Sequence, residues 1–370
     1  MLPKPYHEHF YEVALSFVPE IGPRSIKILI AHLGSAEEIF RTPVKTLAKI
    51  NGIGELRARG FASQDILRRT ETEIERAEQL QIDLLTISHP GYPKRFLNCE
   101  DAPPLLYFKG RANLNAIKSV AIIGTRRNTD YGQRATEALV EGLASQPDLL
   151  IVSGLAAGID TIAHRSSLRH GIPTVGVLGH GVDSIFPSSN RMLAEEMVAD
   201  GGLLSEFPIG TRADRRHFPI RNRVVAAISD VTVLVESEVR GGGMITAYMA
   251  NSYNREVAAF PGRVFDSKSG GPNRLIKKNI AALITGSDDL CALMNWATHK
   301  NDNAKQQQLF VALTPAEEKI VDLLRGKDGI HADDLLVATG FSSSQLAGVL
   351  LQLEMNGIIK VLPGKLYRLN

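Results

Sequence analysis

The sequence predicts an α/β protein built around a doubly wound, mostly parallel sheet, with a helical domain before it and a winged-helix domain after it. Two observations carry this prediction. In the middle of the chain, Val- and Ile-rich runs alternate with helical stretches, as in a parallel sheet covered on both faces. At the end of the chain, three helical stretches precede two short apolar runs joined by Pro363-Gly364, which is the order of a winged helix.

The sheet is predicted from short apolar runs bounded by Gly, Pro and polar residues. The predicted strands are Ser119–Ile123, Leu149–Val152, Thr174–Leu178, Gly202–Ser205, Val231–Val235 and Glu256–Ala259. The predicted helices between them are Tyr131–Ser145, Asp160–His170, Asn190–Asp200, Arg221–Ser229 and Met244–Tyr253.

The length of 370 residues is enough for more than one domain. We expect a helical domain at 1–82, the sheet domain at 83–298, a polar linker at 299–312 and the winged helix at 313–370. Thr314 followed by Pro315 marks the start of the first winged-helix segment, whose helices are expected at Ala316–Arg325, Ala332–Thr339 and Ser343–Asn356.

The cysteine content, the lack of long apolar segments and the net charge limit the class of protein that the sequence can encode. The chain carries only two cysteines, shows no secretory signal and has no apolar run long enough to span a bilayer, so we expect a cytoplasmic protein without a membrane partner. Its net charge of +2 is small. A nucleic-acid ligand would therefore require arginines gathered on one face.

Glycine-rich loops follow three of the predicted strands, and two of them carry arginines. The candidate binding residues in and beside these loops are Gly124, Thr125, Arg126, Arg127, Ser153, Gly154, Gly158, Arg221, Arg223, Arg240, Gly242, Gly243 and Thr246. Glycine lets the backbone approach an anion, and a helix N-terminus directs free N–H groups at it. A single loop of this kind would more often be a packing turn, but three at successive strand ends favour a phosphate-bearing ligand.

The loop spacing argues against the common nucleotide cofactors. The loop that begins at Gly124 lacks the Gly-x-Gly-x-x-Gly pattern, the second strand ends in Ser153 rather than an acid, and no P-loop pattern is present. We therefore expect no cofactor and no metal. The cationic loops suit a polyanionic backbone better.

Seven segments of the central region, in order, resemble the DprA (Smf) family of DNA-processing proteins. They are Val120–Gly132, Ile151–His164, Thr174–Asn190, Leu203–Gly210, His217–Ser229, Gly241–Ala250 and Ala258–Ile276. The resemblance implies a Rossmann-like domain that binds single-stranded DNA and works as a homodimer. It also implies that the protein protects incoming DNA, accommodates single-strand-binding protein and loads the recombinase RecA during natural transformation, without enzymatic activity.

The resemblance also implies roles for particular residues. Gly124 to Arg127 would form the phosphate pocket, with Ser153, Gly154 and Gly158 on its neighbouring wall, Arg221 and Arg223 in a Phe-Pro-x-Arg-Asn-Arg motif, and Gly242, Gly243 and Thr246 in the last glycine turn. The chain departs from the family pattern at three places. These are Arg240–Gly243, Phe186-Pro187 and Asn279–Ala281, the last in a segment associated with dimer and recombinase contacts.

The flanking domains leave two interpretations open. The turns at Val18–Arg24 and Leu47–Glu55 look like helix-hairpin-helix (SAM-like) motifs that grip a DNA phosphate, or they are simple packing turns. The third winged-helix segment, Ser343–Asn356, carries no Arg or Lys, which favours protein contact over binding in a DNA groove.

An enzymatic alternative is a phosphoribohydrolase that cleaves nucleoside monophosphates, suggested by the related fold and by the Gly241–Thr246 loop. No Glu follows that loop to assist glycosidic cleavage. Asp160 and His164 lie four residues apart on a predicted helix and could bind a metal or form an acid–base pair, although orienting a loop or capping a helix is the more common role. Phe186 and Phe207 are candidates for stacking on unpaired bases.

Overall fold

The computed structural model describes residues 9–296, 313–325, 327, 329–356, 358–362 and 365–369. The predicted linker at 299–312 and the Pro363-Gly364 turn lie outside the described residues. The chain divides into two compact units, Met1–Thr298 and His299–Asn370, and each is described by itself.

The first unit contains, among its described residues, a nine-stranded sheet in the order β1-β2-β6-β5-β4-β3-β7-β8-β9. The strands are β1 (Asp83–Thr86), β2 (Leu105–Gly110), β3 (Lys118–Ile123), β4 (Leu149–Ser153), β5 (Thr174–Leu178), β6 (Gly202–Ser205), β7 (Val231–Leu234), β8 (Glu256–Ala259) and β9 (Ala282–Leu283). All neighbouring strands from β6 through β5, β4, β3, β7 and β8 to β9 pair in parallel. At the other end of the sheet, β2 pairs antiparallel with both β1 and β6. The predicted doubly wound, mostly parallel sheet is confirmed.

All six predicted strands are present, and three of them have the predicted bounds. Sequence reasoning missed β1, β2 and β9. Strand β9 has two residues, and β1 has four, with polar residues at both ends. The predictable signal comes from strands buried on both faces, and the edge strands β1 and β9 are too short to show it. Strand β2 lies inside the sheet and its buried run Leu105–Phe108 does carry that signal.

Strand β3 lies at the topological switch point of the sheet. From β3 the chain proceeds through β4, β5 and β6 on one side and then returns to β7 and β8 on the other. The connections after β3 and β7 therefore diverge, and they leave a crevice at the carboxyl ends of these two strands.

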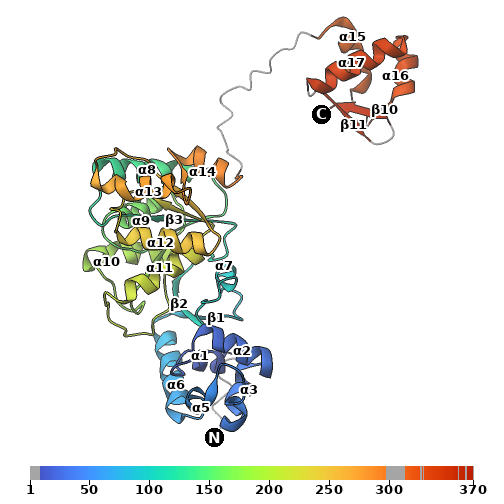
Figure 1. The fold of residues 1–370 in the computed structure, drawn as a ribbon. Coiled ribbons are helices and arrows are strands. Elements are labelled where there is room, and N and C mark those ends of the chain that lie inside the picture. Colours follow the sequence, from blue (N-terminus) through green and yellow to red (C-terminus); the bar gives the residue numbers. More distant parts are fainter. Residues whose placement is uncertain are drawn as a thin grey trace. The chain divides into compact units, whose positions relative to one another are not determined.

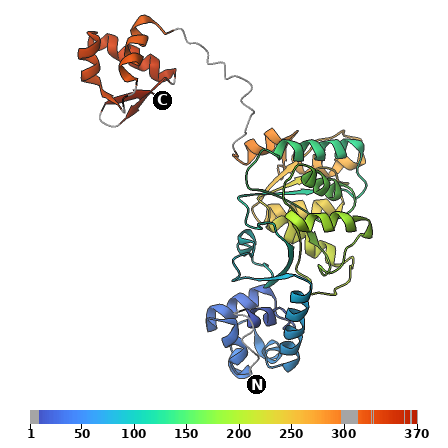
Figure 2. The ribbon, with the colours of Figure 1, turned by 180° about the vertical axis from the view of Figure 1, so that it is seen from behind.

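Helices cover both faces of this sheet. They are α7 (Lys94–Leu97), α8 (Asp130–Leu143), α9 (Ile159–Arg169), α10 (Arg191–Asp200), α11 (His217–Ala227), α12 (Gly242–Ser252), α13 (Gly270–Lys277) and α14 (Ser287–Leu293). Helices α8, α9 and α14 pack on the face that carries Val120 and Ile122, and α11, α12 and α13 pack on the face of Ala121 and Ile123. Helices α11 and α12 face the viewer in Figure 1, and α8, α9 and α10 do so in Figure 2.

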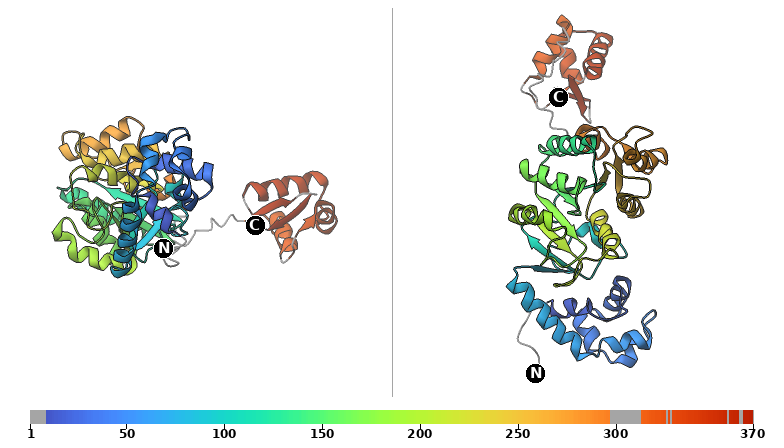
Figure 3. Two further views of the ribbon diagram at one scale, coloured as in Figure 1. Left: turned by 90° about the horizontal axis from the view of Figure 1, so that it is seen from below. Right: turned by 90° about the vertical axis from the view of Figure 1, so that its left-hand side faces the viewer.

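The N-terminal helices lie next to the β1–β2 end of the sheet, as the right-hand view of Figure 3 shows, and share a hydrophobic core with it. They are α1 (Phe10–Leu15), α2 (Pro23–Leu33), α3 (Ala36–Arg41), α4 (Val44–Leu47), α5 (Gly54–Gly60) and α6 (Gln64–Gln79). The carboxylate of Glu73 accepts a hydrogen bond of 2.8 Å from the backbone N–H of Ile209, which ties α6 to the loop after β6. The predicted boundary at residue 83 falls at the first residue of β1.

The turn between α4 and α5 contains the second predicted helix-hairpin-helix motif. Gly52 and Gly54 both have positive φ, at 86° and 67°. Arg57 donates a 2.7 Å hydrogen bond to the carbonyl of Gly52, so this arginine already has a partner within the turn. A DNA contact at this turn stays a prediction.

The second unit is a winged helix, as predicted. Its elements are α15 (Pro315–Leu324), β10 (Ile330–His331), α16 (Ala332–Thr339), α17 (Ser343–Met355), β11 (Ile359–Leu362) and β12 (Leu366–Leu369), with the sheet order β10-β12-β11. Capping boxes formed by Thr314 with Glu317 and by Ser342 with Gln345 start α15 and α17. Throughout the described residues, no single helix is both long and apolar enough to cross a membrane.

Candidate nucleic-acid interface

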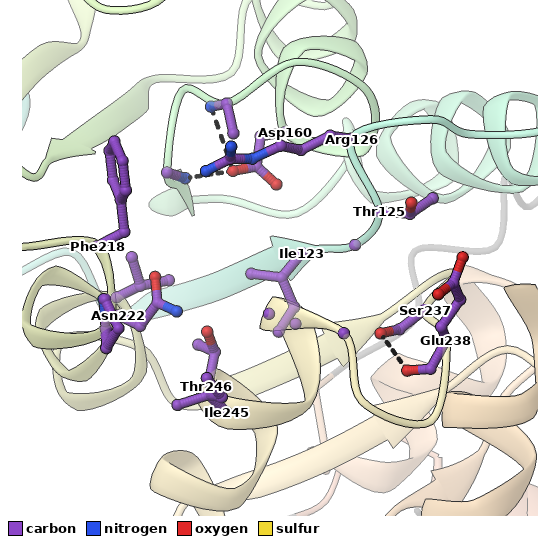
Figure 4. A pocket seen from close by; sticks show the side chains of 18 of the residues that line it. Ile123, Thr125, Arg126, Asp160, Phe218, Asn222, Ser237, Glu238, Ile245 and Thr246 are labelled. Atoms are coloured by element: carbon purple, nitrogen blue, oxygen red, sulfur yellow. Dashed lines mark hydrogen bonds between the residues drawn. The ribbon is translucent and has the colours of Figure 1, made fainter. Parts of the chain in front are cut away.

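A cavity of about 600 Å³ opens at the switch point of the sheet, where the segments after β3 and β7 diverge. The side chains labelled in Figure 4 come from the end of β3, from these two segments and from α9, α11 and α12. Each wall therefore belongs to a different strand–helix connection. The sheet, through its strand order, brings these connections to one place.

The loop after β3 is held by a carboxylate from the loop after β7. Glu236 is buried, and its carboxylate accepts hydrogen bonds from the backbone N–H of Thr129 at 2.9 Å and from the Thr129 hydroxyl at 2.5 Å. The backbone carbonyl of Glu236 accepts from the N–H of Thr125 at 2.8 Å. The Glu236 carboxylate thus holds Thr129, the N-cap residue of α8, and thereby fixes the loop that carries Arg126 and Arg127.

Three glycines that line the cavity differ in whether the structure has room for a side chain at their positions. A Cβ on Gly124 would lie 2.5 Å from the Ile159 side chain, and one on Gly243 would lie 2.8 Å from the Leu234 side chain, so packing excludes a side chain at both. At Gly242 a Cβ would meet no atom within 4 Å, and the backbone does not require glycine there. Gly242 is the first residue of α12, which has no side-chain N-cap. An N–H-rich helix start with open space above it can approach an anion closely.

Arg221 is a buried cation that holds two walls of the cavity together. One of its guanidinium nitrogens donates to the backbone carbonyls of Gly154 and Val177. Burial lowers the pKa of Arg221 to about 10, and the negative charge of Asp160 opposes that shift. A Cβ on Gly154 would lie 2.4 Å from this guanidinium, so the glycine is required by the arginine.

Three other arginines present free positive charge at the cavity. Arg126, Arg127 and Arg215 line it and are exposed, and across the described ranges none of them forms an ion pair. The Arg126 guanidinium carbon lies 5.3 Å from the centre of the Phe218 ring. Lys268 also lines the cavity but is paired with Glu238 at 2.6 Å. Three unpaired guanidinium groups around one crevice attract a polyanion.

The structure brings most of the predicted site residues together. The residues that line the cavity are Gly124, Thr125, Arg126, Arg127, Gly154, Arg221, Gly242, Gly243 and Thr246. Ser153, Gly158, Arg223 and Arg240 do not line it. Ser153 is buried and donates to the carbonyl of Ile122 at 2.6 Å, and Gly158, with a φ of 83°, caps α9.

Arg223 and Arg240 lie outside the lining of the cavity, in environments that differ from each other. Arg223 is paired with Glu206 and donates to the backbone carbonyl of Asp101. Because α11 turns by about 100° per residue, Arg221 and Arg223 leave the helix in different directions. Arg240 is exposed in the loop after β7. Direct roles for these two arginines in binding stay predictions.

The cavity also contains residues that the loop-based reasoning did not single out. Arg215, Phe218, Asn222, Ser237 and Lys268 line it, although Phe218 and Asn222 belong to the motif that was already noted for its arginines. Of the two aromatic candidates for base stacking, Phe186 is 50% exposed and its ring stacks on Phe218 at 6.0 Å. Phe207 instead stacks on His217 at 4.4 Å and is only partly exposed.

Asp160 and His164 do not form a pair with each other. The Asp160 carboxylate accepts from the backbone N–H groups of Gly154 at 3.1 Å and of Ala156 at 3.3 Å. Nδ1 of His164 contacts the Thr174 hydroxyl at 2.7 Å, and this hydroxyl donates to the carbonyl of Ile151. Both side chains therefore orient the backbone. No group of three or more potential metal ligands occurs among the residues that the structure describes.

The fold and the cavity together define a doubly wound α/β protein with an arginine-lined crevice at its switch point. Residues 83–295 match the family described as DNA recombination-mediator protein A, and residues 304–365 match the DprA winged helix domain. The chain belongs to the DNA recombination-mediator protein A (DprA/Smf) family.

Similar proteins named Smf or DprA support the assignment to this family. Protein Smf of Synechocystis sp. is 30% identical, with 98% of each chain covered. DNA processing protein DprA of Streptococcus pneumoniae is 37% identical over 54% of this chain and 70% of its own length.

Two solved structures have the same fold. The X-ray structure of S. pneumoniae DprA superposes with a TM-score of 0.63 and 29% identity, covering 78% of this chain and 97% of that one. DNA processing protein A of Helicobacter pylori superposes with a TM-score of 0.53 and 31% identity, over 59% of this chain and 98% of that one. The second structure is described as showing a single-stranded DNA binding mode.

His164 makes the stability of the fold depend on pH. Burial lowers its pKa to about 3, and the positive charge of Arg221 acts in the same direction. The Nε2 atom is buried with no hydrogen-bond partner within the described residues, so a second ring proton would have no acceptor. Below the unfolded pKa of 6.5 the unfolded chain binds a proton that the folded chain does not. The contribution of His164 to the free energy of unfolding should therefore fall as the pH drops from about 6.5, by at most ~1.4 kcal/mol per pH unit, whereas Glu206, whose pKa burial raises to about 7, contributes in the opposite direction.

Urea unfolding at about pH 7.5, 6.5 and 5.5 measures this slope. The variant His164→Leu removes the titrating group, so on lowering the pH its free energy of unfolding should fall less, or rise more, than that of the wild type, whatever the change in stability at the highest pH. Equal slopes for the two proteins would exclude His164 as the cause.

Proposed function

We propose that the cavity at the ends of β3 and β7 binds the sugar-phosphate backbone of single-stranded DNA and that the protein acts as a recombination mediator. The observation that carries the proposal is the set of three unpaired arginines, Arg126, Arg127 and Arg215, around a crevice that also exposes the open N-terminus of α12. Phosphates are held by such donors without regard to base sequence.

An unpaired strand suits this cavity better than a duplex. Bases of a duplex are held in the stack and must be extruded before they can enter a concave site. An unpaired base is free to enter and to stack on an aromatic ring. Phe218 lines the cavity, and its ring stacks on that of Phe186, which is half exposed. These two rings provide an aromatic surface on which a base can stack. The single-stranded DNA binding described for the H. pylori protein supports the same ligand.

The mediator role is the more specific part of the proposal. It comprises protection of incoming single-stranded DNA, accommodation of single-strand-binding protein, loading of RecA and action as a homodimer in the cytoplasm during natural transformation. The description of the family as a recombination mediator supports it. In this role the protein has no enzymatic activity of its own and uses neither a cofactor nor a metal.

The phosphoribohydrolase alternative requires a carboxylate that is free to act on a glycosidic bond. The acidic side chains that line the cavity, among the described residues, are Asp160 and Glu238. Asp160 is buried under two backbone N–H donors, and Glu238 is paired with Lys268. We therefore favour binding over hydrolysis. Release of free base from nucleoside monophosphates by the purified protein would reverse this preference.

The variant Arg126→Ala should weaken single-stranded DNA binding to the same extent for oligo-dT, oligo-dC and oligo-dA. One charge-assisted contact is worth about 1.5–3 kcal/mol, so the affinity should fall about tenfold or more. The slope of log K against log salt should fall by about 0.7. Fluorescence anisotropy at several salt concentrations measures both quantities.

The matched control for this experiment is Arg134→Ala, an exposed arginine on α8 that does not line the cavity. It should bind like the wild type. If the wild-type protein bound single and double strands equally well, or bound without a dependence on salt, the proposed ligand would be wrong.

The variant Gly242→Ala tests whether the ligand approaches the start of α12. A methyl group there meets no protein atom within 4 Å, so the thermal stability should stay at or slightly above that of the wild type. If a phosphate occupies this space, the affinity for oligo-dT should fall by roughly fivefold or more. The control is Gly348→Ala in α17, where a Cβ is equally unobstructed. Unchanged affinity in Gly242→Ala would place the strand elsewhere.

The mediator role predicts a second effect of Arg126→Ala. On single-stranded DNA coated with single-strand-binding protein, the wild type should speed the onset of RecA ATPase activity, and Arg126→Ala should not. Loading depends on a protein that holds the strand, so loss of the strand contact removes the effect. If the wild type bound single strands normally but left the RecA lag unchanged, DNA binding would stand and the mediator role would fall.

A further inference from the structure

A second concave surface lies on the other side of the loop that follows β3. It has a volume of about 340 Å³ and is formed by α8, α9 and that loop. We call it the α8–α9 groove, and its lining residues are Asn128, Gln133, Glu137, Gly158, Thr161, Ile162, Arg165, Ser166 and Arg169. Nothing in the function proposed above uses it.

The groove and the cavity share one wall. Arg126 and Arg127 line the cavity, and Asn128, the next residue, lines the groove. On the groove side the wall is closed by Gly158, where a Cβ would lie 2.3 Å from the carbonyl oxygen of Thr125. The backbone N–H of Ile159 also donates to this carbonyl at 3.2 Å. The cavity and the groove are therefore separated by this loop alone.

The groove carries free positive charge of its own. Arg165 and Arg169 are exposed, and within the part of the chain that the structure describes neither forms an ion pair. They are four residues apart on α9, so they lie on one face of the helix, separated by a rise of roughly 6 Å. The one carboxylate in the lining, Glu137, accepts a hydrogen bond from Gln133 at 3.1 Å.

A buried hydroxyl in the groove points to a polar ligand independently of these charges. Ser166 is 1% exposed, it belongs to the lining, and its Oγ has no hydrogen-bond partner among the described residues. A buried donor without an acceptor costs free energy unless a ligand or solvent satisfies it. A phosphodiester supplies the acceptor oxygens that such a hydroxyl and two guanidinium groups would bind.

We propose that the α8–α9 groove is a second phosphate-binding subsite, which holds the backbone of the same single strand next to the nucleotides in the cavity. This inference rests on the proposed function of the cavity. The shared wall, the two adjacent arginines Arg165 and Arg169 and the polar lining favour a continuation of one strand over a separate ligand. The subsite reads no base sequence, because its donors face phosphate oxygens.

The test compares a short oligo-dT, which occupies the cavity alone, with a longer one that reaches the groove. The double variant Arg165→Ala/Arg169→Ala should bind the short oligonucleotide like the wild type. For the longer oligonucleotide its affinity should fall by roughly a hundredfold or more, which is tenfold or more for each lost contact. The slope of log K against log salt should decrease by about 1.4, or 0.7 for each lost phosphate contact. Equal affinity and slope for the double variant and the wild type on the longer oligonucleotide would overturn the proposal.

Two controls separate the possible failures. Arg134→Ala, on α8 but in the lining of neither concavity, should leave both affinities unchanged. Arg126→Ala should weaken the short and the longer oligonucleotide alike. If Arg126→Ala has this effect and the double variant has none, the cavity function stands and the groove proposal fails. If Arg126→Ala leaves the short oligonucleotide unaffected, the cavity function itself fails. Thermal melting of each variant confirms that it is folded.

Discussion

The geometry of the cavity depends on one buried cation. Arg221 reaches from α11 to the carbonyl groups at the ends of β4 and β5, and it faces the carboxylate of Asp160 at the start of α9. A charge taken out of water must be neutralised by such partners. Their positions are therefore fixed relative to one another, and with them the walls of the crevice.

The arginines of the site divide into two groups with different tasks. Arg221 and Arg223 are held by the protein itself, through backbone carbonyls and through Glu206. Arg126, Arg127 and Arg215 have no acidic partner in the described ranges and are the ones that can bind an anion. The sequence predicted the gathering of arginines at the strand ends. It could not assign these tasks, because both groups occur in similar loops and only the packed structure shows which guanidinium groups are buried.

The same limit applies to the glycines and to the fold. The glycine loops predicted the location of the crevice, but the need for glycine at 124 and 243 arises from contacts with Ile159 and Leu234, which are distant in sequence. Strands buried on both faces have a continuous apolar pattern, so β3 to β8 were predictable. The edge strands β1 and β9 owe their pairing to neighbours that no local pattern reveals, whereas the apolar run of β2 was present in the sequence. Phe218 lies in the site because of the way α11 turns.

The carboxylate of Glu236 has a kinetic consequence. By occupying the first turn of α8, it orders the loop after β3 before any ligand arrives. The entropy of fixing that loop is thus part of the folding equilibrium and does not oppose association. For the proposed ligand, this ordering means that the loop does not have to be fixed on association, which favours a rate of capture set by diffusion and electrostatic steering.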